Sequence, residues 1–369
     1  MIIFEVNGFI KKLIELKTLL INYTYLEAGI MDGDNGSCLM EEITENTDID
    51  EMVFDAIKVD VIGFGALNVD KLYKVKNIAG VDGESFIKSE DVSPGGSAAN
   101  TIIGLSKLGC STSYIGKIAD DEDGDLLEYN LILNNVYLNN LIYADKGNSG
   151  KVLGFVSEEG DRELYVDPGV NDDIHISEIN PLNVNQAKIL HYTSFVGDSF
   201  KAQVELLDVI VDSVLLSFDP GALYVEKGFE ALRPILERTN ILLINERELK
   251  ILFEDDENLK NGSFRDMAVY LRDFGIDTVV VKRGTEGAYA INSRDDEVKI
   301  PAFLSDAVDT TAAGDSFNAG FLYSYLKGFD LAKSVTVANW VASKTVQGVG
   351  ISSLPEEKEL NEFIDSYEF

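Results

Sequence analysis

The sequence predicts an α/β fold in which a mostly parallel sheet is covered by helices on both faces. Two observations support this prediction: short β-rich segments alternate with helical segments from residue 58 onwards, and glycines mark the ends of helices. The helical segment Phe264–Phe274, for example, is followed by Gly275, at a position where a positive φ suits glycine. Such alternation places successive strands in one sheet, with crossover helices on its two sides.

The sequence predicts the strands and helices of this fold one after another along the chain. A short apolar strand is predicted at Val59–Gly63, a helix at Ala98–Leu108 that ends before Gly109, and a strand at Ser111–Ile115. Four further β-rich segments, each with a helical stretch nearby, are Ile189–Tyr192, Val214–Phe218, Ile241–Ile244 and Thr278–Val281.

Two segments interrupt this alternation. Lys71–Val92 and Lys151–Val166 have alternating polar residues, contain glycines where the chain can turn, and leave no room for a crossover helix. We therefore expect residues of about 71–92 and 150–167 to form a small second sheet that projects from the main sheet as a lid.

The first 57 residues differ from the rest of the chain. Apolar residues recur at helical spacing over residues 8–22, and residues 32–55 then hold nine acidic residues and no basic one. Such an acidic composition is typical of a solvated linker. We expect residues 1–57 to be an N-terminal extension with an acidic linker, and residues 58–369 to form the α/β domain. A partner-binding helix on an acidic tether is the alternative for the extension.

The chain is strongly acidic, with 64 Asp and Glu against 31 Lys and Arg and a net charge of −33. This disfavours nucleic acids and anionic membrane surfaces as partners, because both attract basic proteins. No apolar stretch reaches the ~18 residues of a membrane-spanning helix, and the N-terminus lacks the pattern of a signal peptide. The two cysteines and two histidines are too few for a disulfide framework or a zinc site with metal-binding pairs, which favours a reducing cytoplasmic location.

The first candidate motif is the glycine turn at residues 63–68. It begins like a dinucleotide-binding fingerprint, but Asn68 replaces the third glycine and a lid strand follows in place of a helix, so an NAD-type oxidoreductase is weakly supported. Asn68 and Asp70 instead come after a strand, at the edge where open α/β sheets bind ligands. An amide and a carboxylate there can bind neighbouring sugar hydroxyls; a plain turn is the alternative.

The second motif is the segment Pro94–Asn100, which enters a helix. Two glycines, including Gly96, let a ligand approach the backbone and the N–H groups at the helix start. Asn100 offers both a donor and an acceptor to a polyol. The alternative is a helix start that packs closely on the sheet.

The third motif, Asp309–Gly320, gives the strongest signal. Small residues at 312–314 open a helix, so that successive N–H groups form an anion-binding concavity aided by the helix dipole. Asp315 follows on the first helical turn, where it can accept a proton from an attacking hydroxyl. An N-terminal helical turn with small residues for packing is the alternative.

Together, Gly95-Gly96-x-Ala98-x-Asn100 and Asp309-Thr-Thr-Ala-Ala-Gly-Asp315 resemble the two signatures of the ribokinase-like (PfkB) carbohydrate kinase family. The resemblance covers residues 58–369 and implies a three-layer α/β sandwich with a β-sheet lid. It also implies that ATP, with Mg²⁺, phosphorylates a hydroxyl of a sugar, a sugar phosphate or a nucleoside. Asp315 would be the general base, and the N–H groups of Ala313, Gly314 and Asp315 the anion hole. The acceptor would bind at Asn68, Asp70, Gly96 and Asn100.

Other segments are similar to further parts of this family's site. Residues 245–248 resemble its NxxE segment, in which the amide of Asn245 and the carboxylate of Glu248 organise Mg²⁺ and phosphates. The resemblance implies nucleotide-binding roles for Lys282, Gly284, Gly287 and Asn339. A K⁺ site found in some members would comprise Asp309, Thr311, Thr345, Gly348, Gly350 and Ser353.

The sequence does not identify the molecule that accepts the phosphate. Ser97 stands where ribokinase has lysine, so the resemblance does not establish ribose as the acceptor. A nucleoside kinase is the alternative to a sugar kinase. Arg162 in the lid could meet a sugar or an anionic sugar phosphate. A non-catalytic ligand-binding member should have lost Asp315 or its small neighbours, and a P-loop kinase is excluded because GxxxxGK[ST] is absent. A homodimer through the lid is a further expectation, whereas Asp219-Pro220-Gly221 receives no role.

Overall fold

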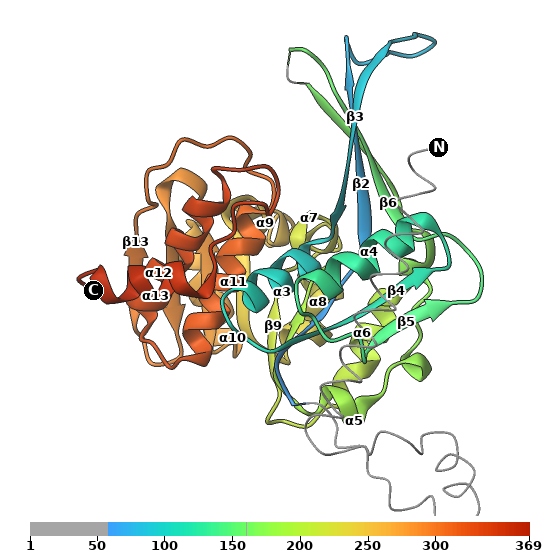
Figure 1. Cartoon of the computed structure of the whole chain (residues 1–369). Helices are drawn as coiled ribbons and strands as arrows, with labels where there is room; N and C mark the ends of the chain where they lie inside the picture. Colours follow the sequence, from blue (N-terminus) through green and yellow to red (C-terminus); the bar gives the residue numbers. More distant parts are fainter. Residues whose placement is uncertain (1–57, 160) are drawn as a thin grey trace, which may run out of the picture. The chain divides into compact units, whose positions relative to one another are not determined.

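The computed structural model describes residues 58–159 and 161–369, so the extension expected at residues 1–57 lies outside the described residues. A nine-stranded sheet forms the centre of the described domain, with the order β13-β12-β11-β10-β9-β8-β1-β4-β5 (Figure 1). Its strands are β1 (Val59–Phe64), β4 (Thr112–Ala119), β5 (Leu141–Ala144), β8 (Ala187–Tyr192), β9 (Leu215–Phe218), β10 (Thr239–Asn245), β11 (Thr278–Lys282), β12 (Ala288–Asn292) and β13 (Glu297–Ile300).

Within this sheet, all neighbouring strands between the edge strand β5 and β11 pair in parallel, which confirms the predicted mostly parallel sheet. The edge strands β12 and β13 are antiparallel. A short 3₁₀ turn at Gly284–Glu286 joins β11 to β12, so the chain reverses direction without a crossover helix. The sequence analysis did not predict these two strands.

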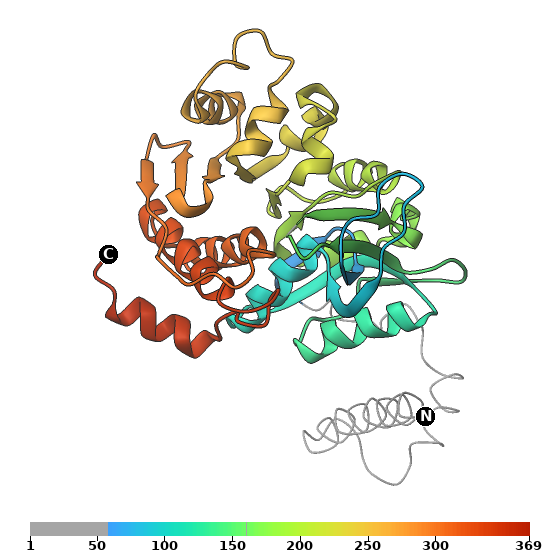
Figure 2. The same cartoon turned by 90° about the horizontal axis from the view of Figure 1, so that it is seen from above.

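Two groups of helices cover the two faces of the sheet, and Figure 2 shows them on opposite sides. One face carries α3 (Ser97–Lys107), α4 (Glu122–Leu133), α11 (Ala313–Leu326), α12 (Leu331–Thr345) and α13 (Glu357–Ser366). The other carries α5 (Pro181–Val184), α6 (Ser199–Leu207), α7 (Gly221–Val225), α8 (Phe229–Leu236), α9 (Glu246–Leu252) and α10 (Phe264–Phe274). Two buried apolar clusters fill the two interfaces, so the domain is a three-layer sandwich.

The predicted lid is a separate four-stranded sheet that projects from the central sheet (Figure 1). It consists of two antiparallel hairpins, which join through parallel pairing of β2 with β6. Its strands are β2 (Asn68–Val75), β3 (Ile87–Gly95), β6 (Gly150–Val156) and β7 (Arg162–Asp167).

Gly96 fixes the junction between the lid and the sandwich. It caps α3 with a φ of 115°, which favours glycine, and a Cβ there would collide with the carbonyl oxygen of Ala66. The chain after β1 and the start of α3 therefore lie in close contact. Within the described parts of the chain, no helix has the length and apolar character needed to cross a bilayer.

Candidate active site

A pocket of about 140 Å³ opens where the lid meets the carboxyl ends of β1 and β8. Parallel α/β sheets bind ligands at this edge. The residues that line the pocket are Ala66, Asn68, Gly96, Ser97, Val166, Pro168, Asn171, Thr193, Ser194, Val196 and Leu223. The expected acceptor residues Asn68 and Gly96 are thus brought together.

Asn171 is a pocket residue that the sequence analysis missed. Its buried side chain accepts a hydrogen bond from the N–H of Leu67 (3.0 Å) and donates to the carbonyl oxygen of Leu67 (2.6 Å) and to Oδ1 of Asn68 (3.0 Å). Asn171 therefore orients Asn68 toward the pocket. No local pattern marks this asparagine, because its partners lie 103 and 104 positions earlier in the chain.

Asp70 lies on the same face of β2 as Asn68, because side chains two residues apart share a face. Its carboxylate packs against Gly95, where a Cβ would lie 2.5 Å from Oδ2. Burial raises the pKa of Asp70 to about 6, and the positive charge of Arg162 opposes this rise. The carboxyl therefore changes charge close to neutral pH.

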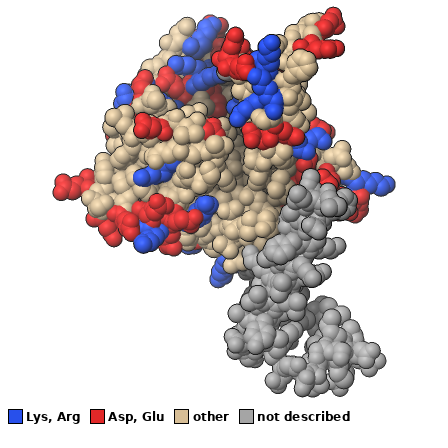
Figure 3. Space-filling model, turned by 45° about the horizontal axis from the view of Figure 1, so that its top comes forward, with Lys and Arg blue, Asp and Glu red and all other residues tan. Residues whose placement is uncertain are grey.

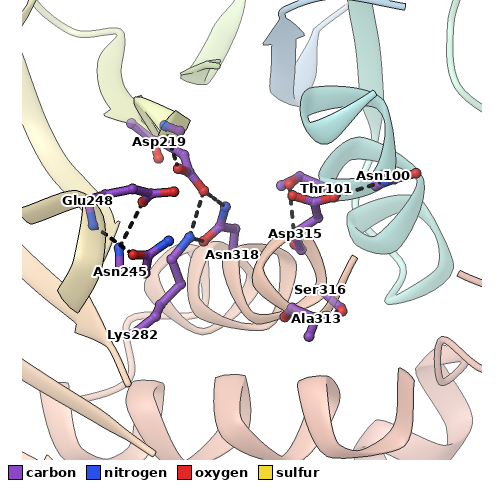
Figure 4. Close-up of polar contacts among 12 residues, drawn as sticks. Asn100, Thr101, Asp219, Asn245, Glu248, Lys282, Ala313, Asp315, Ser316 and Asn318 are labelled. Atoms are coloured by element: carbon purple, nitrogen blue, oxygen red, sulfur yellow. Dashed lines mark hydrogen bonds and ion pairs between the residues drawn. The ribbon is translucent and has the colours of Figure 1, made fainter. Parts of the chain in front are cut away.

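Asp315 lies in the first turn of α11 and contacts residues of α3 (Figure 4). The amide of Asn100 donates to Oδ2 of Asp315 (2.9 Å), and the hydroxyl of Thr101 donates to its main-chain oxygen (3.2 Å). Burial raises the pKa of the Asp315 carboxyl to about 6, which the hydrogen bond from Asn100 partly offsets. A carboxylate with this pKa can act as a general base near neutral pH.

The start of α11 is the anion-binding cradle that the sequence predicts. Ala312 precedes the helix in the left-handed region, with a φ of 61°. The N–H groups of Gly314 and Asp315 lie in the first helical turn, where an α-helix offers no acceptor. The N–H of Ala313, by contrast, already donates to the carbonyl oxygen of Thr310 (3.3 Å). Of the three expected N–H groups, two are therefore oriented for an external anion.

Lys282 borders this cradle and belongs to a buried polar network. Its Nζ lies 2.6 Å from Oδ2 of Asp219 and 3.2 Å from Oδ1 of Asn318, whose amide also donates to Asp219 (2.6 Å; Figure 4). A Cβ at Gly314 would lie 3.5 Å from the same Nζ. The sequence analysis gave Asp219 no role, although its position directly after β9 places it at the ligand-binding edge.

The network keeps Lys282 charged. Burial opposes the charged ammonium, but Asp219 and Glu248 outweigh it and raise the pKa of Lys282. Burial likewise opposes the charged form of Asp219, but Lys282 and the hydrogen bond from Asn318 hold its pKa below the ordinary value. A fixed positive charge thus lies next to the N–H groups of α11.

Asn245 and Glu248 form a reciprocal cap at the start of α9. The N–H of Glu248 donates to Oδ1 of Asn245 (2.8 Å), and the N–H of Asn245 donates to Oε2 of Glu248 (3.0 Å). Burial, and then the negative charge of Asp219, raise the pKa of Glu248. Two neighbouring carboxylates near the cradle are a donor set that suits a hard divalent cation such as Mg²⁺.

The other residues that are expected to bind the nucleotide lie around β11, β12 and α12. Gly284 and Gly287 form the turn between the two strands with φ values of 55° and 84°. The amide of Asn339 donates to the carbonyl oxygens of Ile300 and Pro301, both at 3.2 Å. Asn339 therefore fixes the chain after β13 and does not present a free amide donor.

The residues of the expected K⁺ site lie in two stretches of the chain, around Asp309 and from the end of α12 onwards. The carboxylate of Asp309 accepts from the N–H groups of Thr311 (2.8 Å) and Gly350 (2.9 Å), which joins two loops. Gly348 contacts Ser353 so closely that a Cβ would collide with the hydroxyl. The hydroxyl of Thr345, in contrast, donates to the carbonyl oxygen of Val341 within α12 (3.1 Å). In residues 58–159 and 161–369, no group of three or more His, Cys, Asp or Glu side chains is arranged for a metal ion.

Comparison with protein families identifies the relatives of this site. The model of the pfkB family carbohydrate kinases matches residues 60–358, which include both helix starts and the lid. The chain belongs to the pfkB family of carbohydrate kinases. This match confirms the predicted family, and the architecture confirms the predicted ribokinase-like fold. The alternative of an NAD-type oxidoreductase is therefore wrong.

The chain is also similar to individual kinases of three archaea. A protein of Archaeoglobus fulgidus named an uncharacterized sugar kinase is 40% identical over 252 residues, 67% of this chain and 96% of its own. An ATP-dependent ribose-1-phosphate kinase of Halopiger xanaduensis is 30% identical, over 80% of this chain and 95% of its own. The solved nucleoside kinase of Methanocaldococcus jannaschii, an archaeal member of the ribokinase family, matches with a TM-score of 0.71 and 27% identity, over 84% of this chain and 99% of its own.

Proposed function

We propose that this pfkB-family enzyme transfers the γ-phosphate of ATP to a hydroxyl of a small sugar or a nucleoside, with Asp315 as the general base. The observation that carries this proposal is the place of the Asp315 carboxylate. It lies on the turn of α11 that presents the free N–H groups, and it is held by Asn100, one turn beyond the pocket residues Gly96 and Ser97. Acceptor and phosphate would meet at this carboxylate.

The acceptor hydroxyl loses its proton to Asp315 as its oxygen bonds to the γ-phosphorus. The bond between that phosphorus and the oxygen bridging to the β-phosphate breaks, and ADP leaves with the electron pair. The N–H groups of Gly314 and Asp315 and the ammonium of Lys282 stabilise the negative charge on the transferring group. Asn68 and Asp70 hold neighbouring hydroxyls of the acceptor, so that only one of them faces Asp315.

Glu248 and Asp219 are the residues that would hold Mg²⁺, because they are adjacent carboxylates beside Lys282. Proteins bind Mg²⁺ through one or two carboxylates together with substrate phosphates and water, so two acidic residues suffice. Bound Mg²⁺ would neutralise part of the phosphate charge. The NxxE residue Asn245 would keep Glu248 in position through the reciprocal cap.

The net charge of −33 does not prevent binding of a polyanionic nucleotide. On the face seen in Figure 3, Lys and Arg side chains lie among Asp and Glu side chains, so the surface is not uniformly acidic. Close to the phosphates, the charge of Lys282 and the dipole of α11 count for more than distant surface charges, which salt screens.

Three further points belong to this proposal. The joined loops at Asp309 and Gly350 favour a K⁺ site beside the anion hole. The exposed apolar side chains Phe86, Ile87 and Val92 of the lid favour a homodimer through the lid. The small number of cysteines favours a reducing, cytoplasmic location.

The test is ADP release from ATP and Mg²⁺ in the presence of pentoses, hexoses, sugar phosphates and nucleosides, with the phosphorylated product identified by mass. We expect acceptor-dependent ADP release with at least one of these classes. Binding of ATP and of an acceptor without any ADP release would instead favour a non-catalytic ligand-binding protein.

A further inference from the structure

Three half-exposed apolar side chains surround the acceptor pocket. Val166 of β7 is 45% exposed, Val196 after β8 is 41% exposed, and Leu223 of α7 is 43% exposed. All three line the pocket, yet they come from three separate elements of the chain. Single exposed apolar residues are ordinary, but several gathered around one pocket indicate a surface that a ligand covers.

The apolar surface continues along the lid. Arg162, Leu164 and Val166 share one face of β7, because side chains alternate along a strand. Leu164 and Leu72 of β2 both close over Gly154, where a Cβ would contact them. The lid therefore presents a continuous apolar surface from Val166 to Leu72, beginning at the pocket.

The other side chains that line the pocket include polar ones. Asn68 and Asn171 contribute amides and Thr193 and Ser194 contribute hydroxyls, with Asp70 next to Asn68 on the same face of β2. The lining thus combines side chains that can bind hydroxyl groups with exposed apolar side chains. No Lys or Arg is among the described residues that line it.

The combination of polar and apolar side chains in the pocket favours some classes of acceptor over others. A free sugar carries hydroxyl groups all round and would place some of them against the apolar side chains, where they lose hydrogen bonds to water. A sugar phosphate needs cationic or N–H partners for its phosphate. No cationic side chain among the described residues lines the pocket, and the charge of Arg162, on the same face of β7 as Val166, acts on the carboxylate of Asp70. An acceptor with hydroxyls at one end and a flat apolar ring at the other satisfies both kinds of side chain.

We propose that the acceptor is a nucleoside, whose ribosyl hydroxyls bind at Asn68 and Asp70 and whose base lies against Val166, Val196 and Leu223. This inference rests on the proposed kinase function and specifies the substrate class of the same site. The base would cover the apolar side chains of the lid on one side and those of α7 and the segment after β8 on the other.

The experiment compares kcat/KM of the full chain, with ATP and Mg²⁺, for inosine, adenosine and cytidine against ribose, fructose and ribose 1-phosphate. We expect at least one nucleoside to exceed every sugar and sugar phosphate by 10-fold or more, a lower limit on the order of what burial of a ring contributes. Leu223→Ala and Val196→Ala should each lower kcat/KM for that nucleoside by about 10-fold, the size expected when a pocket loses apolar contact, and lower kcat/KM for ribose by a smaller factor.

Val211→Ala is the matched control, because Val211 is 46% exposed and does not line the pocket. It should leave kcat/KM for every acceptor unchanged. A sugar or sugar phosphate that exceeds all nucleosides would overturn the nucleoside inference and leave the kinase function standing. The same holds if Leu223→Ala and Val196→Ala lower kcat/KM for ribose and nucleosides equally. Absence of ADP release with every acceptor would contradict the kinase function itself.

Discussion

The side-chain amide of Asn100 donates a 2.9 Å hydrogen bond to the carboxylate of Asp315, a residue 215 positions later in the chain. This contact joins the start of α3 to the start of α11, the two helix starts that carry the family signatures. A hydrogen bond to the charged form of a carboxyl lowers its pKa. Asn100 therefore limits the rise in the pKa of Asp315 that burial causes.

The first prediction concerns the pH dependence of activity. Asn100→Leu should raise the pKa of Asp315, because the charged carboxylate loses a donor. A hydrogen bond to a charged group is worth about 1.5–3 kcal/mol, so the acidic limb of the pH profile of kcat should move up from about 6 by roughly one to two units. Thr101→Val is the control, since Thr101 contacts only the main-chain oxygen of Asp315. An unmoved limb in Asn100→Leu would refute this role.

The second prediction concerns the buried pair of Asp219 and Lys282. Asp219→Asn removes the carboxylate that contacts the buried ammonium of Lys282, so the free energy of unfolding should fall by about 3–5 kcal/mol. The KM for ATP should also rise, because Lys282 is no longer held beside Gly314. Urea unfolding and ATP titration measure the two effects. Glu257→Gln, which breaks an exposed pair with Lys260, should cost at most about 1 kcal/mol; equal effects of both variants would contradict the account.

The third prediction concerns the backbone of Ala312, whose φ is 61°. This left-handed conformation costs a residue with a Cβ about 1–2 kcal/mol, and the greater freedom of glycine in the unfolded chain offsets only about half of this. Ala312→Gly should therefore raise the free energy of unfolding by about 0.5–1 kcal/mol, measured by urea unfolding. Ala313→Gly, inside the helix, should instead lower it. Destabilisation by both variants would show that Ala312 is not strained.

The fourth prediction concerns Glu248 and Mg²⁺. Glu248→Gln keeps an oxygen that can accept from the N–H of Asn245 but removes the negative charge, so the Mg²⁺ concentration for half-maximal activity should rise about 10–100-fold. Asp266→Asn makes the same change in the matching cap of α10, whose partner is Ser263, and should leave the Mg²⁺ dependence as it is. An unchanged Mg²⁺ dependence in Glu248→Gln would remove Glu248 from the metal site.

Much of the fold was predictable because its signals are local. The short β-rich segments of β1, β4 and β8 and the glycine after α10 are visible within a few residues, and the structure confirms these elements. The edge strands β12 and β13 were missed because their pairing follows from the short turn after β11.

The site was predictable only where one segment holds a whole motif. Residues 309–315 and 245–248 carry their chemistry within a few positions, so they stand out in the sequence. Asp219 contacts Lys282 and Asn318, which lie 63 and 99 positions later in the chain, only because the folded sheet brings them together. Asn171 likewise meets Asn68 across 103 positions, and neither partner predicts the other.

The last prediction concerns the effect of the Asp315 carboxyl on the stability of the folded protein. Its pKa is about 6 in the folded protein against an ordinary value of 3.8, so ionisation disfavours the folded state above pH 6 and has no such effect below about pH 3.8. Asp315→Asn removes this cost of up to about 3 kcal/mol. The variant should therefore be more stable than the wild type at pH 8, and the difference should vanish near pH 4.

The most direct test of the central claim is the turnover of the same Asp315→Asn variant at saturating ATP and acceptor. General-base catalysis by Asp315 predicts a fall in kcat of at least about 10²-fold, with the affinity for ATP little changed. Turnover near the wild-type rate would contradict the assignment of Asp315 as the base.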